Sequence, residues 1–314
     1  MTWMQGFSGS EVFHAHELGS RGAAEPARAA TVLGDSEPPR QRRPIRDVIG
    51  ALTYLDRSGE RPVAYTYEPP AGTPWRTGTY AEHRVAITDA RPLRGELSLD
   101  VQGFEYVNAP TVVADFADAA AIRGVYLPEV ERIVGVATGA RRVIAFDHNL
   151  RSGALQARDA RGVREPVRRV HNDFTAKSGP ARARAELAAR GEDAEALLAG
   201  RYALVNLWRP IRGPVKDAPL ALADARSIAP QDFITQDLVY RDRVGETYGF
   251  AYNPAHRWYF LADQERHEAL LIKCYDSDAS QAARFTAHTA FDDPTVPPGA
   301  PPRESIEVRT LVIY

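Results

Sequence analysis

Five side chains of types that bind metals and carboxylates follow one another in the C-terminal half of this 314-residue sequence. His171 and Asp173 lie two positions apart, His288 comes far downstream, and Arg303 and Ser305 follow fifteen to seventeen residues after it. Two imidazoles and one carboxylate occupy one face of a metal and leave the other face open, as in non-haem iron(II) oxygenases. An arginine beyond the last ligand offers a rigid pair of donors to the far carboxylate of a keto acid. The pattern predicts a reaction class and leaves the substrate open.

The spacing of the first two residues is what a metal site on a strand requires. Residues two apart in a strand point to the same face, so His171 and Asp173 could reach one ion. Each part alone is weak evidence, because a His and an Asp at a strand end can bond each other and an isolated His288 is typical of a core residue. His14 and His16 have similar spacing, but no carboxylate or arginine follows them, and we set this pair aside.

The composition is that of an ordinary globular protein. The hydrophobic fraction is 44%, the charged fraction 25% and the formal net charge -2, which gives no attraction to nucleic acid or to acidic membranes. The only cysteine, Cys274, fits a reducing compartment. No segment reaches the roughly 20 apolar residues of a membrane span, and the N-terminus lacks the pattern of a signal peptide. We expect a cytoplasmic protein with a small-molecule substrate and no nucleic-acid or membrane partner, and leave a homodimer open.

The N-terminal third of the chain divides into three parts. Residues 18–47 lack apolar periodicity, so 1–47 is expected to be a partly extended arm. Its basic run Arg40–Arg43 is interpreted as solvated, because no aromatic platform accompanies it. Residues 48–110 have the composition of short strands and loops, and 111–139 have helical spacing.

From residue 142 onward the pattern changes to many short strands around one helix, which is expected over 181–199. The expected strands are 143–146, 167–171, 202–208, 220–225, 233–240, 248–252, 258–261, 269–275, 283–291 and 305–314. Many short strands with turns between them are typical of an antiparallel barrel or sandwich. The fold class is therefore α+β, mainly β, with a jelly-roll core mainly in 142–314 and supporting helices.

Four segments resemble one known family. They are VHNDFT (170–175), VNLWRP (205–210), RFTAHTAFDDP (284–294) and PRESIEVR (302–309). With them the chain, from about residue 48 to its end, resembles the hydroxylase/desaturase family of Fe(II)/2-oxoglutarate enzymes, which includes gibberellin desaturase-like and cephalosporin-methoxylation proteins. The resemblance implies a double-stranded β-helix of the cupin-like type in a single oxygenase domain, 48–314.

The same resemblance implies the cofactors and the ligands. His171, Asp173 and His288 would bind Fe(II), with 2-oxoglutarate as co-substrate and O2 as oxidant. Asp173 argues against a halogenase, whose site gives up the carboxylate to make room for halide. The implied activity is hydroxylation or desaturation of a small molecule, with secondary metabolism as its expected setting; ring closure is a further outcome that the sequence leaves open.

Three more residues are candidates for contacts with the organic ligands. Asn206 and Trp208 share a strand face, and Arg209 points away from it or into the next turn. Asn206 could contact the keto acid, and Arg209, Trp208 and Tyr252 the substrate. The structural alternatives are a surface ion pair for Arg209 and core packing for the aromatic residues, which is their usual role in strands.

Two arginines compete for the co-substrate. Arg303 and Arg309 stand roughly 20 Å apart along a strand of about 3.3 Å per residue, so both cannot bind the same carboxylate. Arg303 is favoured because Ser305 adds a hydroxyl donor beside it. Arg309 has Glu307 on its own face, which favours a structural ion pair.

Two other classes of function remain open. A zinc hydrolase can use the same three ligands with an open water position. It has no need of Arg303 and Ser305, and no general base is evident near the ligands. A non-catalytic barrel that binds a ligand or a partner is the other alternative.

Overall fold

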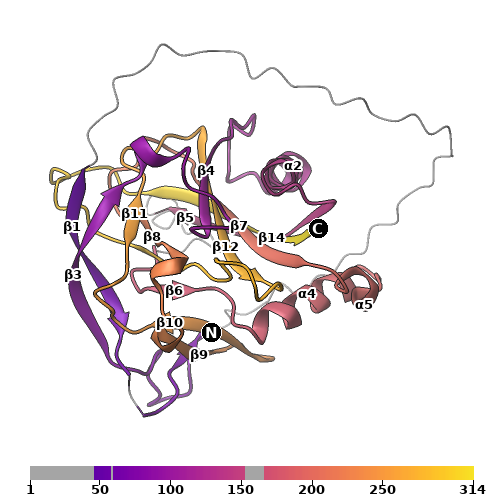
Figure 1. Cartoon of the computed structure of the whole chain (residues 1–314), viewed down its shortest axis with the longest axis horizontal. Helices are drawn as coiled ribbons and strands as arrows, with labels where there is room; N and C mark the ends of the chain where they lie inside the picture. Colours follow the sequence, from indigo (N-terminus) through magenta and orange to yellow (C-terminus); the bar gives the residue numbers. More distant parts are fainter. Residues whose placement is uncertain (1–45, 58, 153–165) are drawn as a thin grey trace.

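The computed structural model describes residues 46–57, 59–152 and 166–314 of the chain. These residues form two sheets with a few helices around them (Figure 1). The nine-stranded sheet has the order β1 (Asp47–Leu55), β3 (Tyr80–Asp89), β11 (Trp258–Phe260), β8 (Leu220–Ala223), β13 (His288–Ala290), β6 (His171–Asn172), β10 (Val244–Phe250), β9 (Phe233–Val239) and β2 (Val63–Tyr65). The five-stranded sheet has the order β4 (Phe104–Asn108), β12 (Glu268–Asp276), β7 (Tyr202–Pro210), β14 (Glu304–Ile313) and β5 (Arg142–Ser152).

The five-stranded sheet is covered on both faces, and its strands β7 and β12 are buried along their whole length. Alternate residues of β7 therefore enter different clusters. Val205 and Leu207 pack with Val130 and Val134 of the helix α2 (Leu127–Thr138), which lies against this sheet (Figure 1). The residues on the other face of β7, such as Trp208, pack in the hydrophobic cluster that lies between the two sheets.

The nine-stranded sheet curls back on itself. Its edge strand β1 forms a bridge from Thr53 to Arg169, two residues before β6, and the Val170 N–H donates to the Thr53 carbonyl at 3.0 Å. The side chains enclosed by this curl include Tyr54, Trp258 and Phe291. The curl thus supports β6 and β13, the strands that carry the expected metal ligands.

The helix expected over 111–139 is present from residue 119 to 138, as α1 (Ala119–Ala121), η2 (Ile122–Tyr126) and α2. It begins late because the Asp118 carboxylate accepts hydrogen bonds from the Ala120 and Ala121 N–H groups, which makes Asp118 the N-cap. It ends at Gly139, whose φ of 67° is the left-handed conformation that glycine favours.

The single helix expected over 181–199 is wrong. Two helices are present, α4 (Ser178–Ala188) and α5 (Ala194–Leu197). Gly191, with a φ of 71°, interrupts the helical conformation between them. The Asp193 carboxylate then caps α5 by accepting a hydrogen bond from the Ala196 N–H. The alanine-rich composition of 181–199 favoured one continuous helix, although Gly191 is a typical helix end and Asp193 a typical N-cap.

The mainly β fold with few helices is confirmed, with changes in several strand bounds. The strand expected over 283–291 shortens to β13, and that expected over 248–252 lies earlier, as β10. The strand expected over 220–225 ends at Ala223, because Asp224 caps the short helix η3 (Ala225–Ser227). Two further short helices are η1 (Arg91–Leu93) and η4 (Pro230–Asp232). Strands β1 to β4, which precede residue 142, also belong to the two sheets.

Several expectations lie outside the described residues. These are the arm up to residue 45, His14, His16 and the basic run Arg40–Arg43. Among the residues that are described, no helix is both long and apolar enough to cross a membrane.

Candidate metal centre

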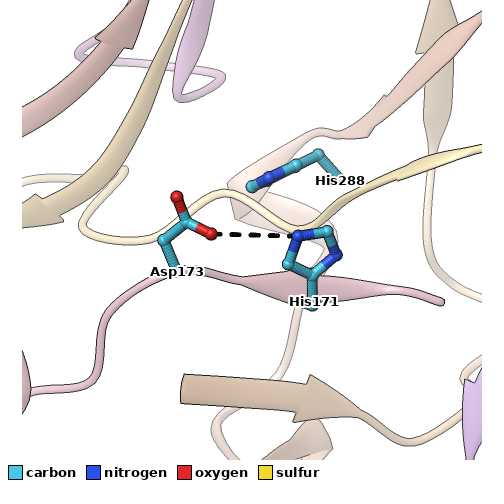
Figure 2. Close-up of side chains that lie close together, drawn as sticks. All are labelled: His171, Asp173 and His288. Atoms are coloured by element: carbon cyan, nitrogen blue, oxygen red, sulfur yellow. Dashed lines mark ion pairs between the residues drawn. The ribbon is translucent and has the colours of Figure 1, made fainter. Parts of the chain in front are cut away.

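The three expected ligands lie together at the junction of β6 and β13 (Figure 2). His171 and His288 are direct partners across these antiparallel strands, and Asp173 follows β6 immediately. One nitrogen of each imidazole and one carboxylate oxygen all lie within 4.8 Å of one another. The His171 Nε2 is 3.8 Å from the Asp173 Oδ1. The two-residue spacing of His171 and Asp173, together with the pairing of β6 and β13, therefore brings the three side chains to one point.

Backbone carbonyls orient both imidazoles. The Nδ1 of His171 lies 2.8 Å from the Arg169 carbonyl oxygen, and the Nδ1 of His288 lies 3.1 Å from the Thr286 carbonyl oxygen. With a proton on Nδ1 donated to the carbonyl, each Nε2 keeps a lone pair for a metal. Burial, with the nearby His288, lowers the pKa of His171 to about 3. This ring is therefore neutral at pH 7, as a metal ligand must be.

The carboxylate of Asp173 is held from behind. Its Oδ2 accepts hydrogen bonds from the Asn206 Nδ2 and the Arg309 Nε, both at 2.9 Å. Burial alone would raise the pKa of Asp173, but the Arg309 guanidinium holds it below its ordinary value. Arg309 also donates from Nη1 to the Asp147 Oδ2 at 2.8 Å. The Oδ1 of Asp173 is left facing the imidazoles.

This donor set fits a divalent iron ion. Two imidazole nitrogens and one carboxylate oxygen converge from one side, which is the facial arrangement of non-haem iron sites. The contacts of the imidazoles with the Arg169 and Thr286 carbonyls, and the hydrogen bonds that Asn206 and Arg309 donate to Asp173, are the outer contacts that such ligands usually have.

A small cavity with charged side chains in its wall lies beside the two imidazoles. Its lining residues are Arg151, Val167, His171, Trp208, Leu220, His288, Arg303 and Glu307. Arg303 is only 5% exposed, and its guanidinium lies over the Trp208 ring, 5.4 Å from the ring centroid. Burial lowers the pKa of Arg303 to about 9. A buried cation of this kind is stabilised by an anion.

Donors near this cavity remain to be satisfied. The Arg303 Nη1 donates to the Ala218 carbonyl at 2.5 Å, but among the described residues neither the Arg303 Nε nor the Ser305 Oγ has a hydrogen-bond partner. Unpaired buried donors cost about 1–3 kcal/mol each, so they favour an acceptor such as a carboxylate. Arg303 and Ser305 thus offer donors of the kind expected for a keto acid.

The other expected residues lie in three different places. Asn206 donates to Asp173 and, at 2.6 Å, to the Glu307 Oε1, and Trp208 lines the cavity. Arg209 is fully buried on the opposite face of β7, with its guanidinium 5.2 Å from the Tyr126 ring centroid. Tyr252 is stacked on His83, with 3.9 Å between the ring centroids. Neither Arg209 nor Tyr252 lines the cavity beside the triad.

Two charged residues of the cavity, Arg151 and Glu307, were not among the candidate site residues of the sequence. Glu307 was assigned to an ion pair with Arg309, but its carboxylate accepts from Asn206 and lines the cavity instead. Arg151 enters because β5 pairs with β14, with Ser305 opposite Arg151. The alternation from Ser305 to Arg309 placed Glu307 on the correct face, but the pairing of β5 has no local signal.

Comparison with known proteins agrees with the site. Residues 52–313 match the model of the family described as Oxidoreductase/YMDC permease-like domain. The Fe(II)/2-oxoglutarate-dependent dioxygenase nvfI of Aspergillus novofumigatus is 35% identical over 267 residues, covering 82% of this chain and 92% of the relative. The hydroxylase/desaturase efuI of Hormonema carpetanum is 31% identical over 261 residues, covering 75% and 85%.

A solved structure shows the same fold. The iron and alpha-ketoglutarate-dependent endoperoxidase NvfI superposes with a TM-score of 0.76 at 30% sequence identity, over 86% of this chain and 98% of that one. A relative of this similarity, aligned over most of both chains, leaves no support for a zinc hydrolase or a non-catalytic barrel. The chain belongs to the hydroxylase/desaturase family of Fe(II)/2-oxoglutarate-dependent dioxygenases.

Proposed function

We propose that His171, Asp173 and His288 bind the Fe(II) of this dioxygenase, and that Arg303 with Ser305 binds the distal carboxylate of 2-oxoglutarate. The observation that carries the proposal is the convergence of the three ligand atoms within 4.8 Å. Arg303 is supported over Arg309 because it lines the cavity beside both imidazoles, whereas Arg309 is engaged by Asp173 and Asp147.

The side chains of this site prepare it for the reaction. When bound, Fe(II) supplies the activation of O2, coupled to conversion of 2-oxoglutarate to succinate and CO2, that oxidises a substrate C–H bond. The carbonyl contacts of the two imidazoles fix the direction of the ligand nitrogens. Asn206 and Arg309 keep the Asp173 carboxylate ionised and oriented. Arg303 orients the keto acid by a charge-assisted contact in a site shielded from water.

The substrate is proposed to be a small molecule of secondary metabolism that is hydroxylated or desaturated. Support for this comes from relatives of this chain that carry the names dioxygenase and hydroxylase/desaturase. The finer resemblance to gibberellin desaturase-like and cephalosporin-methoxylation proteins rests on the four sequence motifs alone.

The ligand assignment is tested by replacing the ligands one at a time. His171→Ala, Asp173→Ala and His288→Ala should each lose Fe(II) binding, measured anaerobically by calorimetry, while circular dichroism stays unchanged. Loss of one of three ligands should exceed the about 10–100-fold effect of changing an outer-shell partner. A variant that keeps native iron affinity would remove that residue from the ligand set.

The co-substrate is tested on the same protein. Anaerobic addition of Fe(II) and 2-oxoglutarate should produce a weak visible charge-transfer band in the native protein and none in His171→Ala. Absence of the band in a protein that binds zinc tightly would favour the zinc hydrolase instead.

A further inference from the structure

A groove of about 270 Å³ has Asp173, one of the three expected ligands, among its lining residues. It lies between α4 and the β9–β10 hairpin, and Asp173 forms part of its wall. Its volume is just below the roughly 300–1,000 Å³ of typical small-molecule sites. His171 and His288 line only the other cavity. The groove and the cavity beside the imidazoles therefore have no lining residue in common.

The walls of the groove are mostly apolar. Phe174 and Leu238 contribute large side chains, and Val244 of the hairpin is 63% exposed. Ala181 and Ala185 lie four residues apart on α4 and so share one helix face. Because both side chains are small, that face leaves space that a leucine would fill. An exposed apolar surface of this kind is typical of a ligand-binding site.

Polar contacts fix the groove next to Asp173. The Thr175 Oγ1 donates to the Glu246 Oε2 at 3.0 Å, and the Ser178 Oγ donates to the Glu246 carbonyl at 2.9 Å. The Glu246 carboxylate also pairs with Arg61 at 2.5 Å. These bonds attach the start of α4 to β10, so the distance between the two walls is set at the end nearest the triad.

Positive charges lie at the outer part of the groove. Lys177 and Arg243 have side chains that are 83% and 53% exposed, and the Arg243 guanidinium lies 4.1 Å from the Tyr240 ring centroid. Lys177 lies 3.4 Å from Glu246, which also pairs with Arg61, and Arg243 lies 3.4 Å from Asp242. Among the lining residues other than Asp173, three are cationic (Lys177, Arg182 and Arg243) and one, Glu246, is acidic.

We propose that this groove binds the substrate, an apolar small molecule with an anionic group that lies near Lys177 and Arg243 while its apolar body extends toward Asp173. The inference rests on the proposed function, since it places the reacting C–H bond beside a proposed metal ligand. The cavity beside the imidazoles is then left to the co-substrate.

The location is tested with 8-anilinonaphthalene-1-sulfonate, an apolar anion whose fluorescence rises in apolar sites. Protein loaded with Mn(II) and 2-oxoglutarate should bind this probe, and Mn(II) should broaden the probe's proton resonances. Ala185→Leu should weaken probe binding at least about tenfold, which corresponds to about 1.4 kcal/mol. The matched control Ala188→Leu adds the same side chain to an exposed position of α4 outside the groove and should bind normally. Equal binding by the two variants would overturn the location.

The charge preference is tested with a matched pair of probes. Arg243→Gln should weaken binding of 8-anilinonaphthalene-1-sulfonate by up to about fivefold, the effect of an exposed ion pair. Binding of N-phenyl-1-naphthylamine, which lacks the sulfonate, should not change. If Arg243→Gln binds both probes as the native protein does, or binds both equally more weakly, the proposal that the substrate carries an anionic group is wrong.

The same measurements separate this inference from the proposed function. If Mn(II) binding, followed by the paramagnetic resonance of the free ion, is the same in His171→Ala as in the native protein, the proposed function fails. If Mn(II) binds through His171 but leaves the probe's resonances sharp, only the groove assignment fails.

Discussion

The Nε of Arg309 donates a hydrogen bond to the Oδ2 of Asp173 at 2.9 Å, joining β14 to a residue 136 positions earlier in the chain. The guanidinium therefore lies behind the carboxylate, and its Nη1 is occupied by Asp147. An arginine in this position can stabilise the ionised ligand but has few donors left for a second anion. Arg309 of β14 and Arg303, which directly precedes β14, therefore have separate roles that can be measured separately.

Arg309→Leu should impair metal binding first. Without the guanidinium, burial raises the pKa of Asp173 and its carboxylate loses an orienting donor. We expect Fe(II) affinity to fall by about 10–100-fold, as for other outer-shell partners. The protein should also lose stability, because Asp173 and Asp147 lose a shared buried partner. Native iron affinity in a folded Arg309→Leu protein would contradict the role given to Arg309.

Arg303→Leu should impair co-substrate binding and spare the metal. Arg303 lines the cavity beside the imidazoles, but no triad residue is bonded to it among the described residues. We expect Fe(II) affinity to stay native and the KM for 2-oxoglutarate to rise by at least about tenfold, since a charge-assisted contact contributes about 1.5–3 kcal/mol. The Fe(II) affinity is measured by titration under argon, and the KM for 2-oxoglutarate by the rate of succinate formation. Loss of 2-oxoglutarate affinity only in Arg309→Leu would move the anchor to Arg309.

The protein should convert 2-oxoglutarate slowly to succinate in the absence of substrate. The proposed co-substrate cavity and the groove are separate, so occupation of one does not require the other. Succinate formation should need Fe(II) and O2 and should be absent in His288→Ala. If iron-loaded protein forms no succinate with any of many candidate substrates, a non-catalytic role would regain support.

Two of the three ligands could be predicted from a local signal, whereas His288 was assigned through the family resemblance. His171 and Asp173 share a face through the two-residue period of a strand, and the same period placed Asn206 with Trp208 and set Arg209 apart. None of this needs knowledge of which strands are neighbours.

The rest of the site depends on pairing between distant strands. Asp147 meets Arg309 only because β5 lies antiparallel to β14 in one register. The groove forms because α4 stops before Gly191 and lies beside the β9–β10 hairpin. Such contacts are set by tertiary packing, which residue patterns do not reveal.

A buried histidine away from the triad should make the stability of the protein depend on pH. His256 is enclosed by the curled sheet, where its Nε2 lies 3.1 Å from the Asp232 Oδ2 and its Nδ1 lies 3.1 Å from the Tyr54 hydroxyl oxygen. The Tyr54 oxygen also accepts from the Trp258 Nε1 at 2.8 Å. Burial lowers the pKa of His256 below its ordinary value of 6.5, although Asp232 opposes this.

The sign of the effect follows from where the proton binds first. As the pH falls through 6.5, His256 in the unfolded chain takes up a proton before the folded protein does, so the unfolded state is stabilised. The contribution of His256 to stability should therefore be complete above that pH and decline below it. At pH 8, His256→Gln should have a lower Tm than the native protein, because it loses a hydrogen bond to Asp232 or Tyr54. From pH 7.5 to pH 5.5, however, its Tm should decline less than that of the native protein. The exposed control His267→Gln should decline as the native protein does. Equal declines in all three proteins would show that His256 does not control acid stability.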